Sequence, residues 1–306
     1  FAVGHDVYWK QFDGLLDSLM RYHKVAVDLV KENDVELIDY GMVDSCEKAY
    51  EVSAAMAADR LDMVFCNMVT YATSSTFAPI IRDCSVPMVL LALQPLMNMD
   101  YSKACTFMQL ENDNICSVPE FTGVAIRLGK SINDVIIGTL KDDAQVMEKI
   151  TEWCDIAKVL HALKGARIGL MGHVMEAMYD MHTDPTAVSK VFGLHVPLLE
   201  VDDIVTLYHE VTEKEISEKT AVICREFDMP VPKSDPITEK LTDIDLYDAA
   251  KAAVALDKLI ERYHLTGLAY YYGGMPDSIQ RKVATTLIVG NSILNAEGIP
   301  MCGEYD

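Results

Sequence analysis

Three places in the sequence combine reactive side chains with positions at which a folded chain could use them. Glu304 follows a glycine near the last residue, His173 follows Gly172 in an expected turn, and residues 270–272 are consecutive tyrosines. A glutamate can bind a metal ion or transfer a proton, a histidine can do either, and a tyrosine ring can stack on a sugar. Each also has a structural interpretation, because terminal glutamates are commonly solvated, Gly-His turns commonly hold loop hydrogen bonds, and aromatic strands commonly pack in cores. The pattern alone leaves both interpretations open.

Other chemically suggestive residues are better explained by folding. Asp202 and Asp203 are expected to form a helix N-cap, where a carboxylate accepts hydrogen bonds from free amides. Met175 and Met178 are interpreted as packing residues by pattern alone, as are most of the seventeen methionines. Eight cysteines show no C-x-x-C pair and no Cys/His spacing of zinc-site type. They predict reduced thiols, which is typical of a cytoplasmic protein.

Several common functional motifs do not occur in the sequence. There is no G-x-G-x-x-G or G-x-x-x-x-G-K-[ST], and Gly169-Leu170-Met171-Gly172 is only half of a dinucleotide fingerprint. There is also no G-x-S-x-G and no H-E-x-x-H. These absences disfavour the usual nucleotide-binding, hydrolase and zinc-protease interpretations.

Composition predicts a soluble globular protein. A chain of 306 residues, half of them apolar, can form two domains with substantial cores. The net charge of −21 disfavours a nucleic-acid partner. No apolar run is long enough for a membrane helix, so no membrane partner is expected. The first residues do not read as a leader sequence and Phe1 is not an initiator, so the start is expected upstream.

Hydrophobic periodicity indicates alternating helices and strands. Helices are expected over residues 11–32, 45–58, 77–84, 142–162, 186–192, 213–227, 245–263 and 278–295. Strands are expected over residues 35–40, 62–66, 87–93, 166–171, 196–201 and 267–271. A left-handed cap is expected at Gly165 and a proline-rich connector at residues 230–236. This rhythm predicts an α/β protein with two doubly wound domains, residues 1–163 and 164–306, each with a mainly parallel sheet.

Ligands in such folds bind beyond the carboxyl ends of the strands. In the first domain these ends are expected at Gly4-His5-Asp6, at residues 67–75 and at residues 94–100. We therefore expect any binding site of the first domain to draw on these segments.

Five segments, in order along the chain, resemble the L-arabinose/L-fucose isomerase superfamily, and most closely its arabinose-isomerase-like members. The similar segments are Gly4-His5-Asp6-Val7-Tyr8-Trp9-Lys10-Gln11-Phe12, Tyr71-Ala72-Thr73-Ser74-Ser75-Thr76-Phe77-Ala78-Pro79 with Leu93-Gln94-Pro95, Ser117-Val118-Pro119-Glu120-Phe121-Thr122-Gly123, Gly172-His173-Val174-Met175-Glu176-Ala177-Met178-Tyr179-Asp180, and Gly303-Glu304-Tyr305-Asp306. The chain would then contain the N-terminal and central domains of such an enzyme, without its C-terminal domain.

The resemblance implies a metal-dependent aldose–ketose isomerase that acts on a pentose or deoxyhexose such as L-arabinose or L-fucose through an ene-diol. Glu304 would be a metal ligand and the catalytic acid/base, and Mn²⁺ the expected ion, with Mg²⁺ or Co²⁺ as alternatives. The substrate-binding residues that it implies are Asp6, Tyr8, Trp9, Tyr71, Gln94, Glu120, His173, Met178 and Tyr179. It also implies a homo-oligomer, a trimer or hexamer, with sites between subunits. The remaining ligands are expected beyond Asp306.

Two departures from the family leave the sugar open. Ile115-Cys116-Ser117 stands where arabinose isomerases carry a histidine, and the loop that begins at Tyr71 lacks the histidine of the family's His-Thr-Phe segment. Two other functions also stay open. One is a sugar-binding or regulatory module without catalysis, and the other is an oxidoreductase, which the missing glycine motif disfavours.

Overall fold

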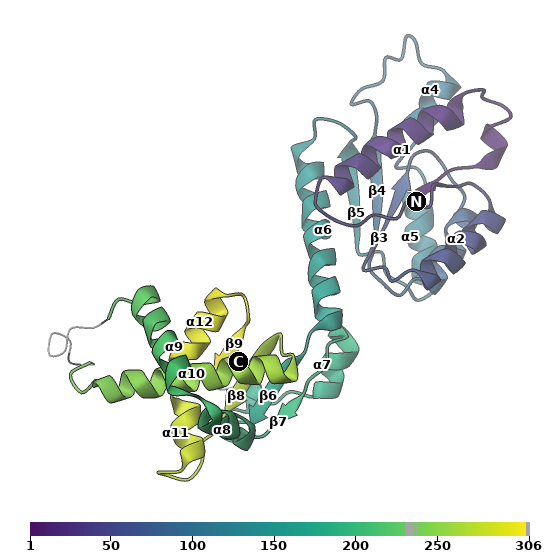
Figure 1. Cartoon of the computed structure of the whole chain (residues 1–306). Coiled ribbons are helices and arrows are strands. Elements are labelled where there is room, and N and C mark those ends of the chain that lie inside the picture. Colours follow the sequence, from purple (N-terminus) through teal and green to yellow (C-terminus); the bar gives the residue numbers. More distant parts are fainter. Residues whose placement is uncertain (230–235, 237, 304–306) are drawn as a thin grey trace. The chain divides into compact units, whose positions relative to one another are not determined.

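The computed structural model describes residues 1–229, 236 and 238–303, and the chain divides into two compact units (Figure 1). Unit 1 is Phe1–His161 and unit 2 is Ala162–Asp306. Each unit contains its own parallel sheet and helices, which confirms the α/β class and the two mainly parallel sheets. The connector predicted at residues 230–236 lies, except for Pro236, outside the described residues.

The sheet of unit 1 has five parallel strands in the order β2-β1-β3-β4-β5. Their bounds are β1 (Ala2–Val3), β2 (Met42–Val43), β3 (Val64–Met68), β4 (Met88–Gln94) and β5 (Asp134–Thr139). The direction of strand addition reverses between β1 and β3. The segments that leave these two strands therefore diverge at the carboxyl edge of the sheet, the place where folds of this type bind ligands.

Helices cover both faces of this sheet (Figure 1). They are α1 (Leu15–Lys31), α2 (Cys46–Ala58), α3 (Ala78–Asp83), α4 (Thr106–Glu111), α5 (Val118–Arg127) and α6 (Ala144–Gly165), with the short helices η1 (Asp6–Tyr8) and η2 (Ser74–Thr76). Val89 and Leu91 of β4 pack in the core formed with α1 and α6, whereas Met88 and Leu90 pack in the core formed with α2, α3 and α5. Alternate side chains of one strand thus fill two cores, and each fully buried leucine contributes about 1.5–3 kcal/mol.

Unit 2 also contains a parallel sheet, which has four strands in the order β7-β6-β8-β9. The strands are β6 (Ile168–Gly172), β7 (Leu198–Leu199), β8 (Gly267–Tyr271) and β9 (Met301–Gly303). The helices are η3 (Tyr179–Met181), α7 (Pro185–Phe192), α8 (Val201–Glu210), α9 (Glu213–Glu226), α10 (Asp243–Tyr263), α11 (Ile279–Thr285) and α12 (Ile288–Ala296). Here the order reverses between β6 and β8.

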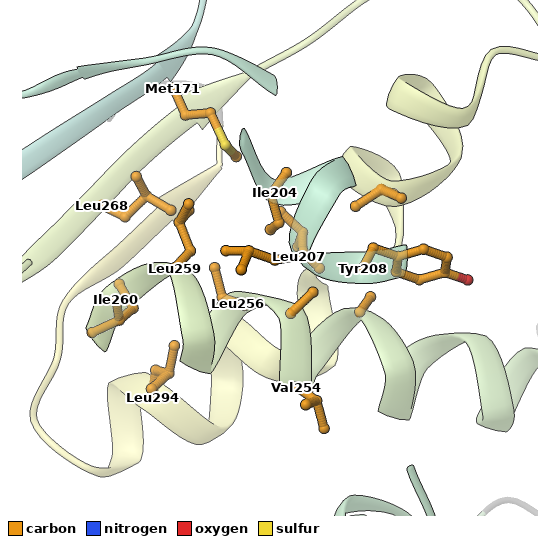
Figure 2. Packing of buried hydrophobic residues seen from close by; sticks show 14 of the residues in the cluster. Met171, Ile204, Leu207, Tyr208, Val254, Leu256, Leu259, Ile260, Leu268 and Leu294 are labelled. Carbon is orange, nitrogen blue, oxygen red and sulfur yellow. The ribbon is translucent and has the colours of Figure 1, made fainter. Parts of the chain in front are cut away.

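The core of unit 2 forms where α8, α10 and α12 pack on the sheet (Figure 2). Leu256 and Leu259 of α10 are fully buried and lie near Ile204 of α8 and Leu268 of β8. The buried residues of α10 form a continuous apolar stripe, which is why the hydrophobic periodicity of this segment predicts a helix. No helix among the described residues is long and apolar enough to cross a membrane.

One predicted strand is wrong and another is shorter than predicted. Residues 35–40 do not join the sheet, because the edge strand is Met42–Val43 instead. Val35 and Leu37 do pack against a core, so their alternation reflects burial and not strand pairing. The strand predicted over residues 196–201 is only Leu198–Leu199, because Val201 already begins α8.

Three predicted helix ends also differ from the structure. Gly165 closes α6 without a left-handed conformation. The N-cap of α8 is Glu200, and Asp203 instead completes a capping box by accepting a hydrogen bond from the Glu200 amide at 2.9 Å. The helix predicted over residues 278–295 is split into α11 and α12. Thr285 and Thr286 donate to the carbonyls one turn earlier, which disturbs the helix at this point.

We predict that Gly172→Ala strongly destabilises unit 2. Gly172 has a φ of 88°, and a Cβ there would lie 2.1 Å from the carbonyl oxygen of Tyr271. Gly298 is a matched control, since its φ is 86° but a Cβ would meet nothing within 4 Å. Gly298→Ala should cost about 1–2 kcal/mol for the backbone conformation alone, and Gly172→Ala clearly more. Urea unfolding measures both, and equal losses would contradict the steric explanation.

Candidate functional site

The reversal point of the first sheet brings two tyrosines into one polar cluster. The chain leaves β1 into η1, which contains Tyr8, and leaves β3 into the loop that contains Tyr71. Burial raises the pKa of Tyr8, and nearby Tyr71, Asp113 and Cys116 raise it further. Tyr8 is therefore an uncharged hydroxyl at neutral pH and can donate as well as accept a hydrogen bond. We call Tyr8, Tyr71, Asp113, Cys116 and Glu120 the edge cluster.

Glu120 joins the edge cluster from the first turn of α5. Its Oε1 accepts a hydrogen bond of 2.7 Å from the amide of Ser74, and its Oε2 lies 3.5 Å from the Tyr71 hydroxyl. Burial and then the Glu120 charge raise the pKa of Tyr71. The long Tyr71 contact leaves both groups capable of a stronger hydrogen bond with a third partner.

Ser117 and Asn114 attach the loop before α5 to the end of β3. The Ser117 hydroxyl accepts from the Ala72 amide at 2.9 Å and donates to the Ala72 carbonyl at 2.8 Å. Asn114 donates from Nδ2 to the carbonyl of Met68 at 2.9 Å. Both side chains are buried, and Asn114 Oδ1 has no hydrogen-bond partner among the described residues. These hydrogen bonds hold the backbone that carries the edge cluster. The buried acceptor Asn114 Oδ1 beside it remains without a partner among the described residues.

The Asp113–Cys116 contact argues against a nucleophilic thiol. Burial raises the pKa of Cys116, and the charge of Asp113 raises it further. Burial likewise raises the pKa of Asp113, although the Cys116 thiol donates a hydrogen bond to it. A protonated thiol is a weak nucleophile, so these residues are better suited to binding polar groups.

The other residues predicted for the first site are not part of the edge cluster. Trp9 donates from Nε1 to Asp44 at 2.8 Å, and Gln94 donates from Nε2 to the carbonyl of Asn112 at 3.1 Å. Asp6 is exposed, with its carboxylate 3.4 Å from Nδ1 of His5. Trp9 and Gln94 hold the surrounding loops through these bonds.

In unit 2, the predicted residues follow β6 at the second reversal point. His173 donates from Nδ1 to the Val174 carbonyl at 3.1 Å, which leaves Nε2 as an acceptor. Its ring meets Tyr271 edge-on, with centroids 5.3 Å apart. Tyr179 is 84% exposed and stacks on His182. Met178 is half-buried just before η3.

Tyrosines 270–272 have different environments, so neither interpretation of the tripeptide applies to all three. Tyr270 is buried in the core of unit 2 and accepts a hydrogen bond from Asn291. Tyr271 and Tyr272 are partly exposed and contact the His173 ring.

The described residues do not assemble the expected metal site. Glu304, assigned as ligand and acid/base, lies outside the described part of the chain. Within the described residues, no group of three histidine, cysteine, aspartate or glutamate side chains could hold an ion.

A separate cavity of about 590 Å³ lies elsewhere in unit 1, between the sheet and helices α1 and α6. His23 on its wall is buried, accepts at Nδ1 from Asn67 at 3.1 Å, and donates from Nε2 to Asp39 at 2.9 Å. These two hydrogen bonds of His23 were not predicted from the sequence. His23 follows Leu15 and Leu19 on the buried face of α1, and this spacing was the available signal.

Protonation of His23 should make the stability of unit 1 depend on pH. Burial lowers the pKa of His23 below its ordinary value of 6.5, despite the hydrogen bond to Asp39. The unfolded chain therefore binds this proton at a higher pH than the native protein does. Stability is full above about pH 6.5 and falls as the pH drops below it, by at most about 1.4 kcal/mol per pH unit. The pKa of Asp39 is lowered as well, but this affects the stability only below about pH 3.8, the ordinary pKa of this carboxyl group.

Urea unfolding at pH 7 and pH 5 measures this effect. We expect His23→Gln to reduce the difference in unfolding free energy between the two pH values. His161→Gln is the control, because it removes an exposed histidine of the same unit that also bonds an aspartate. An equal reduction in both variants would contradict the role of His23.

Comparison with protein-family models and with curated proteins gives no match to this chain.

Proposed function

We propose that the chain binds a neutral monosaccharide at the carboxyl edge of unit 1, as part of an aldose–ketose isomerase of the arabinose/fucose type. The observation that carries the proposal is the edge cluster, in which the Tyr71 hydroxyl lies 3.5 Å from Glu120 Oε2 and both Tyr71 and Asp113 raise the pKa of Tyr8, beside the point where the strand order reverses. Tyr71 and Glu120, two of the residues implied by the family resemblance, are thus in contact although they are 49 positions apart in the sequence.

The chemistry of the edge cluster suits sugar hydroxyls. Each hydroxyl can donate one hydrogen bond and accept others, so it pairs well with a protonated phenol and a carboxylate. Tyr8 and Tyr71 supply donors, and Glu120 supplies charged acceptor oxygens. Asp113 and Glu120 would repel a phosphate group, which favours an unphosphorylated pentose or deoxyhexose over a sugar phosphate.

Isomerisation moves a proton between C1 and C2 and exchanges a carbonyl with a hydroxyl. A bound Mn²⁺ ion would supply polarisation of the carbonyl in such an enzyme. The residues of the edge cluster would bind and orient the hydroxyls of the sugar, and Glu304 is proposed as the acid/base. The family resemblance is the support for Glu304, and the edge cluster is the support for binding.

We predict that Tyr71→Phe weakens binding of L-arabinose or L-fucose about five- to tenfold, because one hydrogen bond is lost. Glu120→Gln should weaken it at least as much, since a charged acceptor is replaced. Tyr40→Phe is the matched control: Tyr40 also bonds a carboxylate, Asp59 at 2.6 Å, but precedes β2 at the opposite edge of the sheet. Calorimetry with each sugar measures the dissociation constants.

Turnover distinguishes the enzyme from a binding module. In the full-length protein, Mn²⁺-dependent conversion of aldose to ketose should disappear in Glu304→Gln while sugar binding remains. Sugar binding without turnover in the wild-type protein would instead establish a non-catalytic module. If the wild-type protein binds neither sugar, the proposed function is wrong.

The proposed site also predicts self-association. Apolar side chains are exposed on the loops around the carboxyl edge of unit 1: Val7 44%, Met97 78%, Tyr101 87% and Ile115 45%. A second copy of the chain could bury them while closing the site. We expect light scattering to give a trimer or hexamer, and a stable monomer would contradict a site shared between subunits.

A further inference from the structure

In unit 2, Tyr270 and Asn291 form an isolated polar pair at the end of β8. Asn291 of α12 donates from Nδ2 to the Tyr270 hydroxyl oxygen at 2.7 Å. Burial raises the pKa of Tyr270, so the hydroxyl keeps its proton. Because the oxygen already accepts from Asn291, this proton is directed at another acceptor.

The second unused group of the pair is Asn291 Oδ1. This atom is buried and accepts no hydrogen bond among the described residues. Reversing the amide would leave its NH₂ group without a partner instead, so either orientation keeps one polar atom unsatisfied. A buried polar group without a partner costs about 1–3 kcal/mol, which an apolar side chain would avoid. The pair therefore calls for an explanation beyond folding.

The position of the pair indicates where its missing partner would lie. Asn295, one turn after Asn291 on α12, binds both backbone groups of Met301, at 2.8 Å and 3.2 Å. The helix runs antiparallel to β9, so Asn291 lies level with the end of that strand. In agreement, a Cβ placed on Gly303 would be 3.5 Å from the Tyr270 hydroxyl. The pair thus lies at the carboxyl edge of the second sheet, next to the residue that precedes Glu304.

The same situation occurs in unit 1. Asn114 and Asn291 are the two residues of the described part whose buried side-chain oxygens have no partner. Asn114 binds the last residue of β3, and Asn291 binds the next-to-last residue of β8. Both strands lie at the reversal point of their own sheet, where this type of fold binds ligands.

We propose that Tyr270 and Asn291 bind one hydroxyl group of the sugar at the carboxyl edge of unit 2. The sugar hydroxyl donates its proton to Asn291 Oδ1 and accepts the proton of Tyr270, so both unused groups are satisfied at once. This inference rests on the proposed function, because it takes the sugar as the ligand. It adds a recognition point in the second unit, next to Gly303 at the end of β9.

Calorimetry with L-arabinose and L-fucose on the full-length protein tests the inference. We expect Tyr270→Phe and Asn291→Leu each to raise the dissociation constant about tenfold. The double variant should be little worse than either single variant, because both remove contacts to the same hydroxyl. Asn291→Leu should keep or raise the thermal midpoint, since it removes an unsatisfied buried acceptor. Tyr263→Phe is the control. The Tyr263 hydroxyl, at the last residue of α10, also binds a polar side chain, Asp203, but it is not part of the Tyr270–Asn291 pair.

The outcomes separate this inference from the proposed function. If the wild-type protein binds a sugar and both variants bind it unchanged, the pair is structural and the inference is wrong, while the proposed function stands. A crystal structure of the sugar complex with only an ordered water between Tyr270 and Asn291 would overturn it in the same way. Weaker binding that appears only together with a lower thermal midpoint also counts against it. If the wild-type protein binds neither sugar, both proposals fail.

Discussion

The burial of both faces of each sheet is the constraint on which the rest of this structure depends. Consecutive residues of β4 point into different cores, so polar side chains have no place along the middle of the strand. They collect where the strands end, and the point at which the strand order reverses is where folds of this type bind ligands. The edge cluster in unit 1 and the Tyr270–Asn291 pair in unit 2 both follow from this arrangement.

Much of the fold could be predicted from periodicity, because the strongest patterns come from buried faces. Gly267–Tyr271 is the predicted strand, and α10 starts within two residues of the predicted helix and ends at the same residue, since its apolar stripe is continuous. The predictions are wrong where a segment is buried without pairing with a strand, or where side-chain hydrogen bonds interrupt a helix. Val35 and Leu37 are packed against a core without a neighbouring strand, and the two threonines between α11 and α12 interrupt a helix whose hydrophobic pattern continues.

The candidate site was predictable only in part, because its geometry depends on residues far apart in the sequence. Tyr8, Tyr71 and Glu120 were identified through family resemblance; in the structure Tyr71 contacts Glu120, and Tyr71 also raises the pKa of Tyr8. Asp113 gave no signal, since its role depends on a loop that Ser117 attaches to a different strand. For the hydrogen-bonded group of His23, Asp39 and Asn67, the sequence indicated only that His23 lies on the buried face of a helix. This group joins α1, a connecting segment and β3, and no local spacing encodes that meeting.

The attachment of Ser117 to Ala72 has a consequence for how such a site could change over time. One hydroxyl satisfies both the amide and the carbonyl of Ala72, so the backbone beside Tyr71 is held without help from the tyrosine side chain. The path of the loop therefore does not depend on which side chain stands at position 71. In the proposed site, a new side chain at position 71 would alter which sugar hydroxyls are bound without changing the path of the loop, so substrate preference could diverge at this position.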